Sequence, residues 1–298
     1  MKILIIGSKG FVGRHVIDYF NSQESYQVTG CDILEDQSQD YFRVDVFYPD
    51  YTGVFQAHKF DVCINCSGAA NVSESFADPL KDYTLNCVNV YKILETIRKL
   101  NPSCRFLNLS SAAVYGNPSS LPIKEDQRLS PLSPYGDHKL QAEIICKEFN
   151  QYFNIKTCSV RVFSAYGPKL SKQIFWDIYQ KALKSKEITL FGTGNESRDF
   201  IYINDLAIAL ECVIKHADFN AEAYNIASGI EVKISEAANT LIEYLGMGNT
   251  INFNHQTKSG DPVNWHADIS KLKSFGFMPS YKIHDGLKET AQWMLKGK

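Results

Sequence analysis

Three residues of this chain have the types and the spacing for proton transfer near neutral pH. Tyr135 and Lys139 are four positions apart, so on a helix they lie on the same face. A phenol ionises more easily beside an ammonium group, so Tyr135 can act as an acid or a base. Ser111 follows the apolar run Cys104–Leu109, where its hydroxyl can bind the substrate oxygen that Tyr135 deprotonates. A tyrosine and a lysine at this spacing are usually a solvated surface pair, so the prediction depends on their context.

A glycine-rich turn near the N-terminus supplies that context. The turn follows the apolar segment Lys2–Ile6 and opens a helical pattern. Its first glycine allows a tight bend, the second lets a pyrophosphate approach the backbone, and the third lets helix pack on strand. The free N–H groups of the helix would then face the phosphates. The dinucleotide-binding residues predicted here are Gly7, Lys9, Gly10, Phe11, Val12 and Gly13.

Asp32 and Lys9 point to different forms of the dinucleotide. Asp32 ends the second expected strand, where a carboxylate can accept hydrogen bonds from the adenosine ribose. Its charge would repel a 2′-phosphate, which favours NAD. Lys9 could pair with that phosphate, which leaves NADP open. A plain strand–helix turn is the alternative, but strand, turn, helix and acid together favour the dinucleotide site.

The first two thirds of the chain alternates short apolar runs with amphipathic segments. This alternation indicates βαβ units around a parallel sheet, and near-continuous apolar runs fit strands buried on both faces. The expected strands are Lys2–Ile6, Gln27–Cys31, Asp61–Asn65, Cys104–Leu109 and Lys156–Val162, and the expected helices are Val12–Asn21, Leu80–Lys99 and Tyr135–Tyr152. Four prolines make Asn117–Pro134 a long loop before the last of these helices.

The expected fold is therefore α/β, a Rossmann-type doubly wound parallel sheet with a smaller C-terminal substrate-binding lobe. We assign residues 1–165 to a dinucleotide-binding domain and residues 166–298 to the lobe, in which the alternation is less regular. Segments such as Ile203–His216 and Glu222–Ile226 could return to the main sheet. The region around 203–227 therefore leaves the boundary open.

Composition argues against several classes of protein. Of the 298 residues, 44% are hydrophobic and 21% are charged, as in ordinary soluble proteins. A formal net charge of -2 gives no electrostatic reason to expect nucleic acid or a membrane surface as partner. No stretch approaches the roughly 20 apolar residues of a membrane helix. The eight cysteines are expected as free thiols in the cytoplasm, and the scattered histidines lack ligand spacing, so no metal is expected.

Several motifs together resemble a known family. The glycine turn, Ser110–Gly116, Tyr135–Lys139, Arg161–Pro168 and Arg198–Tyr202 are similar, in the same order, to motifs of the extended short-chain dehydrogenases/reductases of the NAD-dependent nucleotide-sugar epimerase/dehydratase type. The resemblance implies that Ser111, Tyr135 and Lys139 are catalytic, and that Tyr135 and Lys139 also contact the cofactor. It further implies cofactor contacts for Asp45 and Val46 at the adenine, Ser67, Gly68 and Ala69 along the channel, and Asn86 on the adjoining helix. Arg198 resembles the arginine that binds the nucleotide diphosphate.

Departures from the family pattern narrow the reaction. Members that eliminate water or decarboxylate typically carry acidic residues where this chain has Ala112 and Ala113, so neither reaction is expected. Ser164 stands where an asparagine often contacts the substrate. Lys258 stands near the place of an arginine for the second phosphate, and its point charge would hold a diphosphate less rigidly.

Three functions remain open. The first is an NAD-dependent nucleotide-sugar 4-epimerase, and the second is an NAD(P)H-dependent nucleotide-4-keto-sugar reductase. The third is a non-catalytic dinucleotide-binding regulator, which would have no need for an intact Ser–Tyr–Lys set. Apolar surface on Leu80–Lys99 and on the helix from Tyr135 favours a homodimer, although burial within a monomer explains the same pattern. His138 is expected to face outward.

Overall fold

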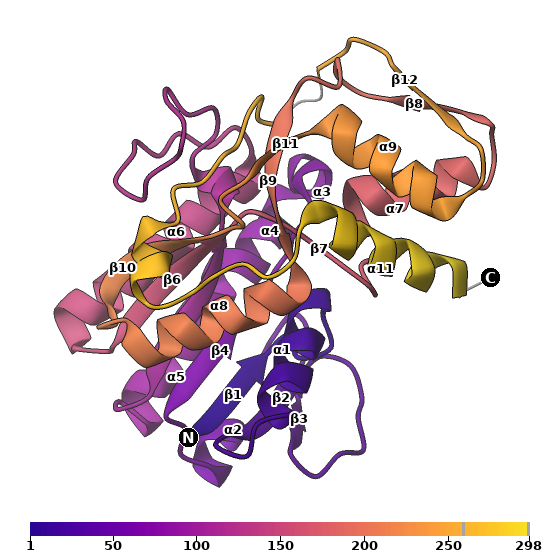
Figure 1. The fold of residues 1–298 in the computed structure, drawn as a ribbon. Coiled ribbons are helices and arrows are strands. Elements are labelled where there is room, and N and C mark those ends of the chain that lie inside the picture. The colour runs from indigo at the N-terminus through magenta and orange to yellow at the C-terminus, as the bar shows by residue number, and fades with distance from the viewer. Residues whose placement is uncertain (258–259, 297–298) are drawn as a thin grey trace.

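The computed structural model describes residues 1–257 and 260–296. Its main body is a seven-stranded sheet with helices on both faces (Figure 1). The strand order is β10-β6-β5-β4-β1-β2-β3, and neighbouring strands pair in parallel throughout. The strands are β1 (Lys2–Ile6), β2 (Gln27–Asp32), β3 (Tyr41–Arg43), β4 (Val62–Asn65), β5 (Arg105–Ser111), β6 (Thr157–Val162) and β10 (Asn220–Ile226). The structure thus confirms the doubly wound parallel sheet.

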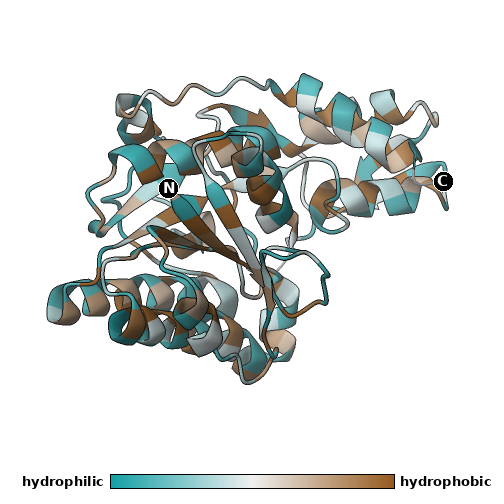
Figure 2. Ribbon diagram, turned by 90° about the horizontal axis from the view of Figure 1, so that it is seen from below, coloured by the Kyte–Doolittle hydropathy of each residue, from teal (hydrophilic) through white to brown (hydrophobic). Residues whose placement is uncertain are grey.

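Helices cover both faces of this sheet, which explains its near-continuous apolar strands. The covering helices are α1 (Phe11–Asn21), α2 (Thr52–Ala57), α5 (Asn89–Leu100), α6 (Pro134–Phe153) and α8 (Ile203–His216). In β1, Ile3 and Ile5 join a core cluster with α1 and α8, whereas Leu4 and Ile6 join a cluster with α2, α5 and α6. Successive side chains of a strand point to opposite faces, so both sets must be apolar. Figure 2 shows the hydrophobic strands at the centre of the molecule.

Two helices differ from the sequence expectation near the predicted site. The expected helix Leu80–Lys99 consists of α4 (Pro79–Tyr83), the π-helical turn η1 (Thr84–Val88) and α5. Such π-helical turns are rare and are frequent at functional sites. The helix α6 extends one residue beyond each expected end. It begins at Pro134 because the Ser133 hydroxyl accepts a hydrogen bond of 3.1 Å from the Gly136 N–H and caps the helix.

After β6 the chain builds a lobe and also returns to the sheet. The lobe contains α7 (Gln173–Ala182), α9 (Ile234–Leu245), α10 (Ser270–Ser274) and α11 (Ile283–Lys296), with β7 (Ser164–Tyr166), β8 (Glu187–Leu190), β9 (Ser197–Tyr202), β11 (Glu231–Lys233) and β12 (Thr250–Phe253). Figure 1 shows most of these elements together, above the sheet. Between them, α8 packs on α1 and β10 pairs with β6. The segment around 203–227 therefore lies with the main sheet, and the division at residue 165 stays a prediction.

One more short helix lies between β4 and α4. The short helix α3 (Val72–Ala77) packs against both α4 and α6.

Within residues 1–257 and 260–296, no helix has the length and apolar character needed to cross a membrane.

Candidate active site

The three predicted proton-transfer residues meet where β5 ends and α6 begins. Ser111 is the last residue of β5, and Tyr135 and Lys139 lie on the first two turns of α6. The Lys139 Nζ donates a hydrogen bond of 3.0 Å to the Leu109 carbonyl and lies 5.9 Å from the centre of the Tyr135 ring. The structure therefore brings the predicted set together at the carboxyl edge of the sheet, where open α/β sheets bind ligands.

Burial shifts both ionisable members of this set toward their neutral forms. It raises the pKa of Tyr135 to about 12, and a hydrogen bond with Ser111 works in the other direction. Burial also lowers the pKa of Lys139 to about 8, and the charge of Asp82 works against that shift. The common cause is that the charged form of each group loses its hydration. A cation beside the phenol, such as the ring of an oxidised nicotinamide, would lower the pKa of Tyr135 toward neutral pH.

The glycine turn has the backbone that a dinucleotide phosphate requires. Gly7 has φ +80°, and a Cβ there would lie 2.6 Å from the Ser67 nitrogen. A Cβ on Gly13 would lie 2.1 Å from the Gly7 oxygen, so the protein's own packing requires both glycines. Gly10 is less crowded, since its Cβ would meet only that oxygen, at 3.2 Å. No side chain caps α1, whose first turn is Phe11, Val12 and Gly13, so its N–H groups remain available to an anion.

At the ribose end of this turn, the lysine is already paired. Asp32 ends β2, and its Oδ2 accepts a hydrogen bond of 2.8 Å from the backbone nitrogen of Lys9. The Lys9 ammonium forms an ion pair with Asp36. Nearby, Arg43 pairs with Glu35 at 2.5 Å. These carboxylates neutralise the cations that a 2′-phosphate would need, so the site favours NAD over NADP.

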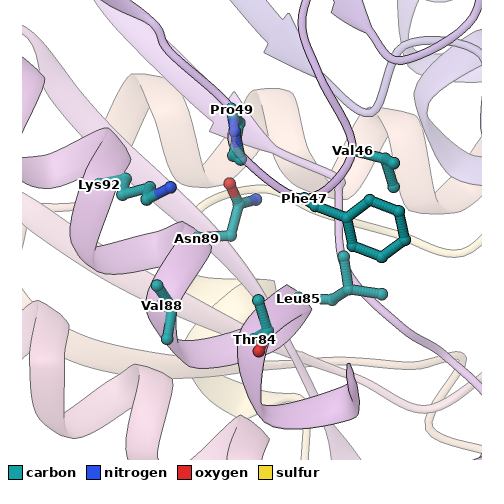
Figure 3. Close-up of a pocket in the computed structure, with 8 residues that line it drawn as sticks. All are labelled: Val46, Phe47, Pro49, Thr84, Leu85, Val88, Asn89 and Lys92. Carbon is teal, nitrogen blue, oxygen red and sulfur yellow. The ribbon is translucent and has the colours of Figure 1, made fainter. Parts of the chain in front are cut away.

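A pocket lies between the β3–α2 connection and the helix formed by η1 and α5 (Figure 3). It is lined by Val46, Phe47, Pro49, Thr84, Leu85, Val88, Asn89 and Lys92. Val46, for which the resemblance implies an adenine contact, is one of these lining residues. Asp45 shapes the same connection, since its Oδ1 accepts hydrogen bonds of 2.8 Å from the backbone nitrogens of Phe47 and Tyr48.

The segment after β4 contains the three residues expected along the cofactor channel, Ser67, Gly68 and Ala69. The Ser67 hydroxyl accepts a hydrogen bond of 2.9 Å from Asn89. Gly68 has φ +118°, and a Cβ there would lie 2.4 Å from Oδ1 of Asn86. That oxygen is buried without a hydrogen-bond partner in the structure. Buried acceptors are rarely left unpaired in native proteins, so the orphan oxygen fits a site that a bound cofactor completes.

The predicted substrate residues come from the lobe. Arg198 lies in β9, donates a hydrogen bond of 2.7 Å to the Ser197 carbonyl, and places its guanidinium 5.5 Å from the centre of the Trp265 ring. These contacts fix the orientation of a group suited to phosphate. Ser164 begins β7, which pairs with β9, so both residues belong to one small sheet. Lys258 lies outside the described residues.

Trp265 links this arginine to the loop after Ser111, a role that the sequence did not indicate. The Trp265 Nε1 donates a hydrogen bond of 3.0 Å to the Gly116 carbonyl. Trp265 and the fully buried Ala112 belong to the same core cluster. Trp265 therefore contacts both Arg198, the predicted diphosphate residue, and the segment that follows Ser111.

The prediction that His138 faces outward was wrong. Its side chain is only 11% exposed, and its Nδ1 lies 2.6 Å from Oδ1 of Asp82 on α4. Nδ2 of Asn86 donates to the same carboxylate oxygen, at 3.0 Å. No local sequence pattern connects positions 82 and 138, so only the packing of α4 on α6 reveals this pair.

Comparisons with known proteins agree with this geometry. The model of the NAD dependent epimerase/dehydratase family matches residues 3–227. A putative UDP-glucose 4-epimerase of Methanocaldococcus jannaschii is 28% identical over 303 residues, which cover 98% of each chain. The crystal structure of UDP-glucuronic acid 4-epimerase from Bacillus cereus, in complex with UDP-glucuronic acid and NAD, has a TM-score of 0.91 at 26% identity and covers 100% of both chains. The family model spans well over half of the sequence, and the chain belongs to the NAD-dependent epimerase/dehydratase family.

Proposed function

We propose that this enzyme is a nucleotide-sugar 4-epimerase that uses NAD. The observation that carries the proposal is a single acid/base set, Ser111, Tyr135 and Lys139, followed by two alanines. Neither Ala112 nor Ala113 can give or take a proton, so elimination of water would lack its second acid. The full-length similarity to proteins named as UDP-sugar 4-epimerases supports the same activity.

The residues of the site divide the work of such a reaction. The glycine turn Gly7–Gly13 would hold NAD, which would supply the hydride acceptor and donor for C4 of the sugar. Tyr135 takes the proton of the C4 hydroxyl as the hydride leaves, and it gives a proton back to the C4 oxygen when the hydride returns. Ser111 hydrogen-bonds that oxygen, and Lys139 stabilises the phenolate. Arg198 holds the nucleotide portion of the substrate while the 4-keto sugar rotates to present its other face to the cofactor. Lys258 and Ser164 are further candidates for this binding role.

Product analysis tests the proposal directly. The purified protein is incubated with uridine, thymidine, guanosine and cytidine diphosphate hexoses, without added cofactor. We expect C4 epimers of at least one sugar to interconvert, and NAD to copurify with the protein. Stoichiometric consumption of NADH or NADPH with a 4-keto-6-deoxy sugar, without any interconversion, would establish the reductase instead. Absence of both reactions would leave the regulatory function.

We further propose a cytoplasmic homodimer, in which residues 1–165 hold the dinucleotide and residues 166–298 the substrate. Helices α4, α5 and α6 present several large apolar side chains to solvent, namely Leu80, Tyr91, Ile144 and Tyr152. A hollow beside them is lined by Tyr83, Cys87, Val88, Tyr91, Lys92 and Ile145. An apolar surface of this kind supports pairing with a second copy.

A further inference from the structure

One buried carboxylate lies beside the catalytic helix, outside the predicted catalytic set. The Asp82 side chain is 3% exposed, and its Oδ1 accepts hydrogen bonds from His138 and Asn86. Because a carboxylate only accepts hydrogen bonds here, His138 donates through Nδ1. The single oxygen Oδ1 therefore ties α6, which carries Tyr135 and Lys139, to the π-helical turn that carries Asn86.

The other oxygen of Asp82 is buried without a hydrogen-bond partner in the structure. A carboxylate so poorly compensated exerts its charge over a longer distance than a solvated one, because little water screens it. That charge acts on both ionisable catalytic residues, and it raises the pKa of Tyr135 and of Lys139.

The other ionisable groups near Lys139 do not replace Asp82. Cys66 and Cys87 face the ammonium, but burial raises the pKa of each thiol to about 12, so both are neutral at physiological pH. Glu143 also acts on Lys139, but its two oxygens bind Arg161 at 3.0 and 2.8 Å. Asp82 is therefore the main counter-charge of Lys139.

The other charged residues on the elements around Asp82, such as Lys81 of α4 and Asp137 of α6, are exposed to solvent. Glu74 of α3 is exposed and accepts a hydrogen bond of 2.7 Å from Asn71. Tyr83, on α4 itself, packs edge-on against the His138 ring, with 5.3 Å between ring centres.

We propose that Asp82 and His138 form a positioning pair, in which Asp82 sets the charge balance at Tyr135 and Lys139 and His138 holds the carboxylate in place. Neither residue belongs to the proposed catalytic set, and the pair acts on that set through the charge of Asp82 and through α6. This inference rests on the proposed roles of Ser111, Tyr135 and Lys139.

The first experiment measures the ionisation of Tyr135 in the NAD-loaded protein. Tyrosinate absorbance is recorded against pH, and the curve of a matched Tyr135→Phe variant is subtracted in each background. Asp82→Asn keeps an acceptor for His138 and removes the charge. We expect the Tyr135 midpoint to fall by ~0.5 pH unit or more. Both limbs of the kcat profile should move to lower pH, with KM changed less than about twofold.

Asp137→Asn is the matched control, since it makes the same chemical change at an exposed position of the same helix. Water screens that charge, so we expect a shift of less than ~0.2 pH unit. An equal shift in both variants would overturn the proposal, as would no shift in Asp82→Asn. The absorbance titration does not require turnover, so it can succeed or fail independently of the epimerase activity.

Substitution of His138 separates positioning from packing. His138→Gln keeps an amide donor for Asp82, whereas His138→Leu removes the donor that holds the carboxylate beside α6. We expect His138→Leu to lower the Tyr135 midpoint as Asp82→Asn does, and His138→Gln to restore it to within ~0.2 pH unit of the parent. If both substitutions gave the same midpoint, the pair would be only a packing contact.

Discussion

At the scale of single residues, the predicted role of Tyr135 depends on the positive charges that lie beside it. Burial raises the pKa of Tyr135 to about 12, which on its own would leave no base at the substrate, whereas Lys139, with a pKa of about 8, stays largely protonated at neutral pH. Ionisation of Tyr135 near neutrality therefore depends on Lys139 and on the positive ring of the oxidised cofactor. The hydroxyl of Tyr135 is the group that must ionise for the proposed reaction to proceed.

Removal of that hydroxyl tests its role. In Tyr135→Phe we expect kcat to fall by about 10²–10⁴-fold, since a positioned acid/base contributes that much. NAD should remain bound, because the ring and the glycine turn are unchanged. Tyr152→Phe makes the same change at an exposed site on the same helix and should keep the parent kcat. Epimerisation at an undiminished rate in Tyr135→Phe would remove Tyr135 from the mechanism.

The choice between NAD and NADP is also decided by individual side chains. Asp36 neutralises Lys9, so Asp36→Asn should free the ammonium to attract a 2′-phosphate. We expect the affinity for NADPH to rise about tenfold, equivalent to about 1.4 kcal/mol, with NADH affinity nearly constant. Fluorescence of the bound reduced nicotinamide gives both constants. Asp40→Asn, which removes an equal charge from the same loop, should change neither.

At the scale of elements, continuous apolar runs of sequence predicted the strands of the main sheet well. The packing of α4 and η1 on α6 was not predicted. Strands β1, β4, β5 and β6 begin and end within two residues of their expected bounds, because burial on both faces demands unbroken apolar sequence. The π-helical turn at Asn86 was missed, since one inserted residue hardly disturbs a helical pattern. His138 was misplaced because α4 and η1 cover the first turns of α6 on a side that its sequence alone leaves undefined. Gly7 and Gly10 lie between β1 and α1, and Gly13 lies in the first turn of α1, as the strand–turn–helix pattern predicted.

The contact between α1 and β1 gives a prediction at this scale. A Cβ on Gly13 would lie 2.1 Å from the Gly7 oxygen, so Gly13→Ala must push α1 away from the turn. We expect a loss of about 2 kcal/mol or more in the free energy of unfolding, with weaker NAD binding. Gly53→Ala, on α2, meets nothing within 4 Å and should stabilise the protein by about 0.5–1 kcal/mol. Urea denaturation and NAD titration measure both effects, and equal stability of the two variants would contradict the packing argument.

At the scale of the whole molecule, the same helices serve the active site and the exposed apolar face. Helix α6 carries Tyr135 and Lys139 at its start, and further along it exposes Ile144 at 56%. Tyr83 packs on His138 and also lines the hollow beside this face. A second copy bound there would cover helices whose inner sides hold the catalytic residues and Asn86. Assembly and catalysis are therefore expected to depend on one another.

A charged residue on that face tests the dependence. Ile144→Arg places a guanidinium in the expected interface. Because burial of an unpaired charge is costly, we expect this variant to elute as a monomer. The monomer should lose part of its kcat, because the outer sides of α5 and α6 become solvated. Met278→Arg is the control, since that side chain is 80% exposed and follows Phe277, which packs in the core cluster of α1 and α8 and not in that of α5 and α6. Light scattering gives the mass of each variant. A parent protein that is already monomeric at micromolar concentration would refute the dimer, while a monomeric Ile144→Arg with full kcat would uncouple assembly from the site.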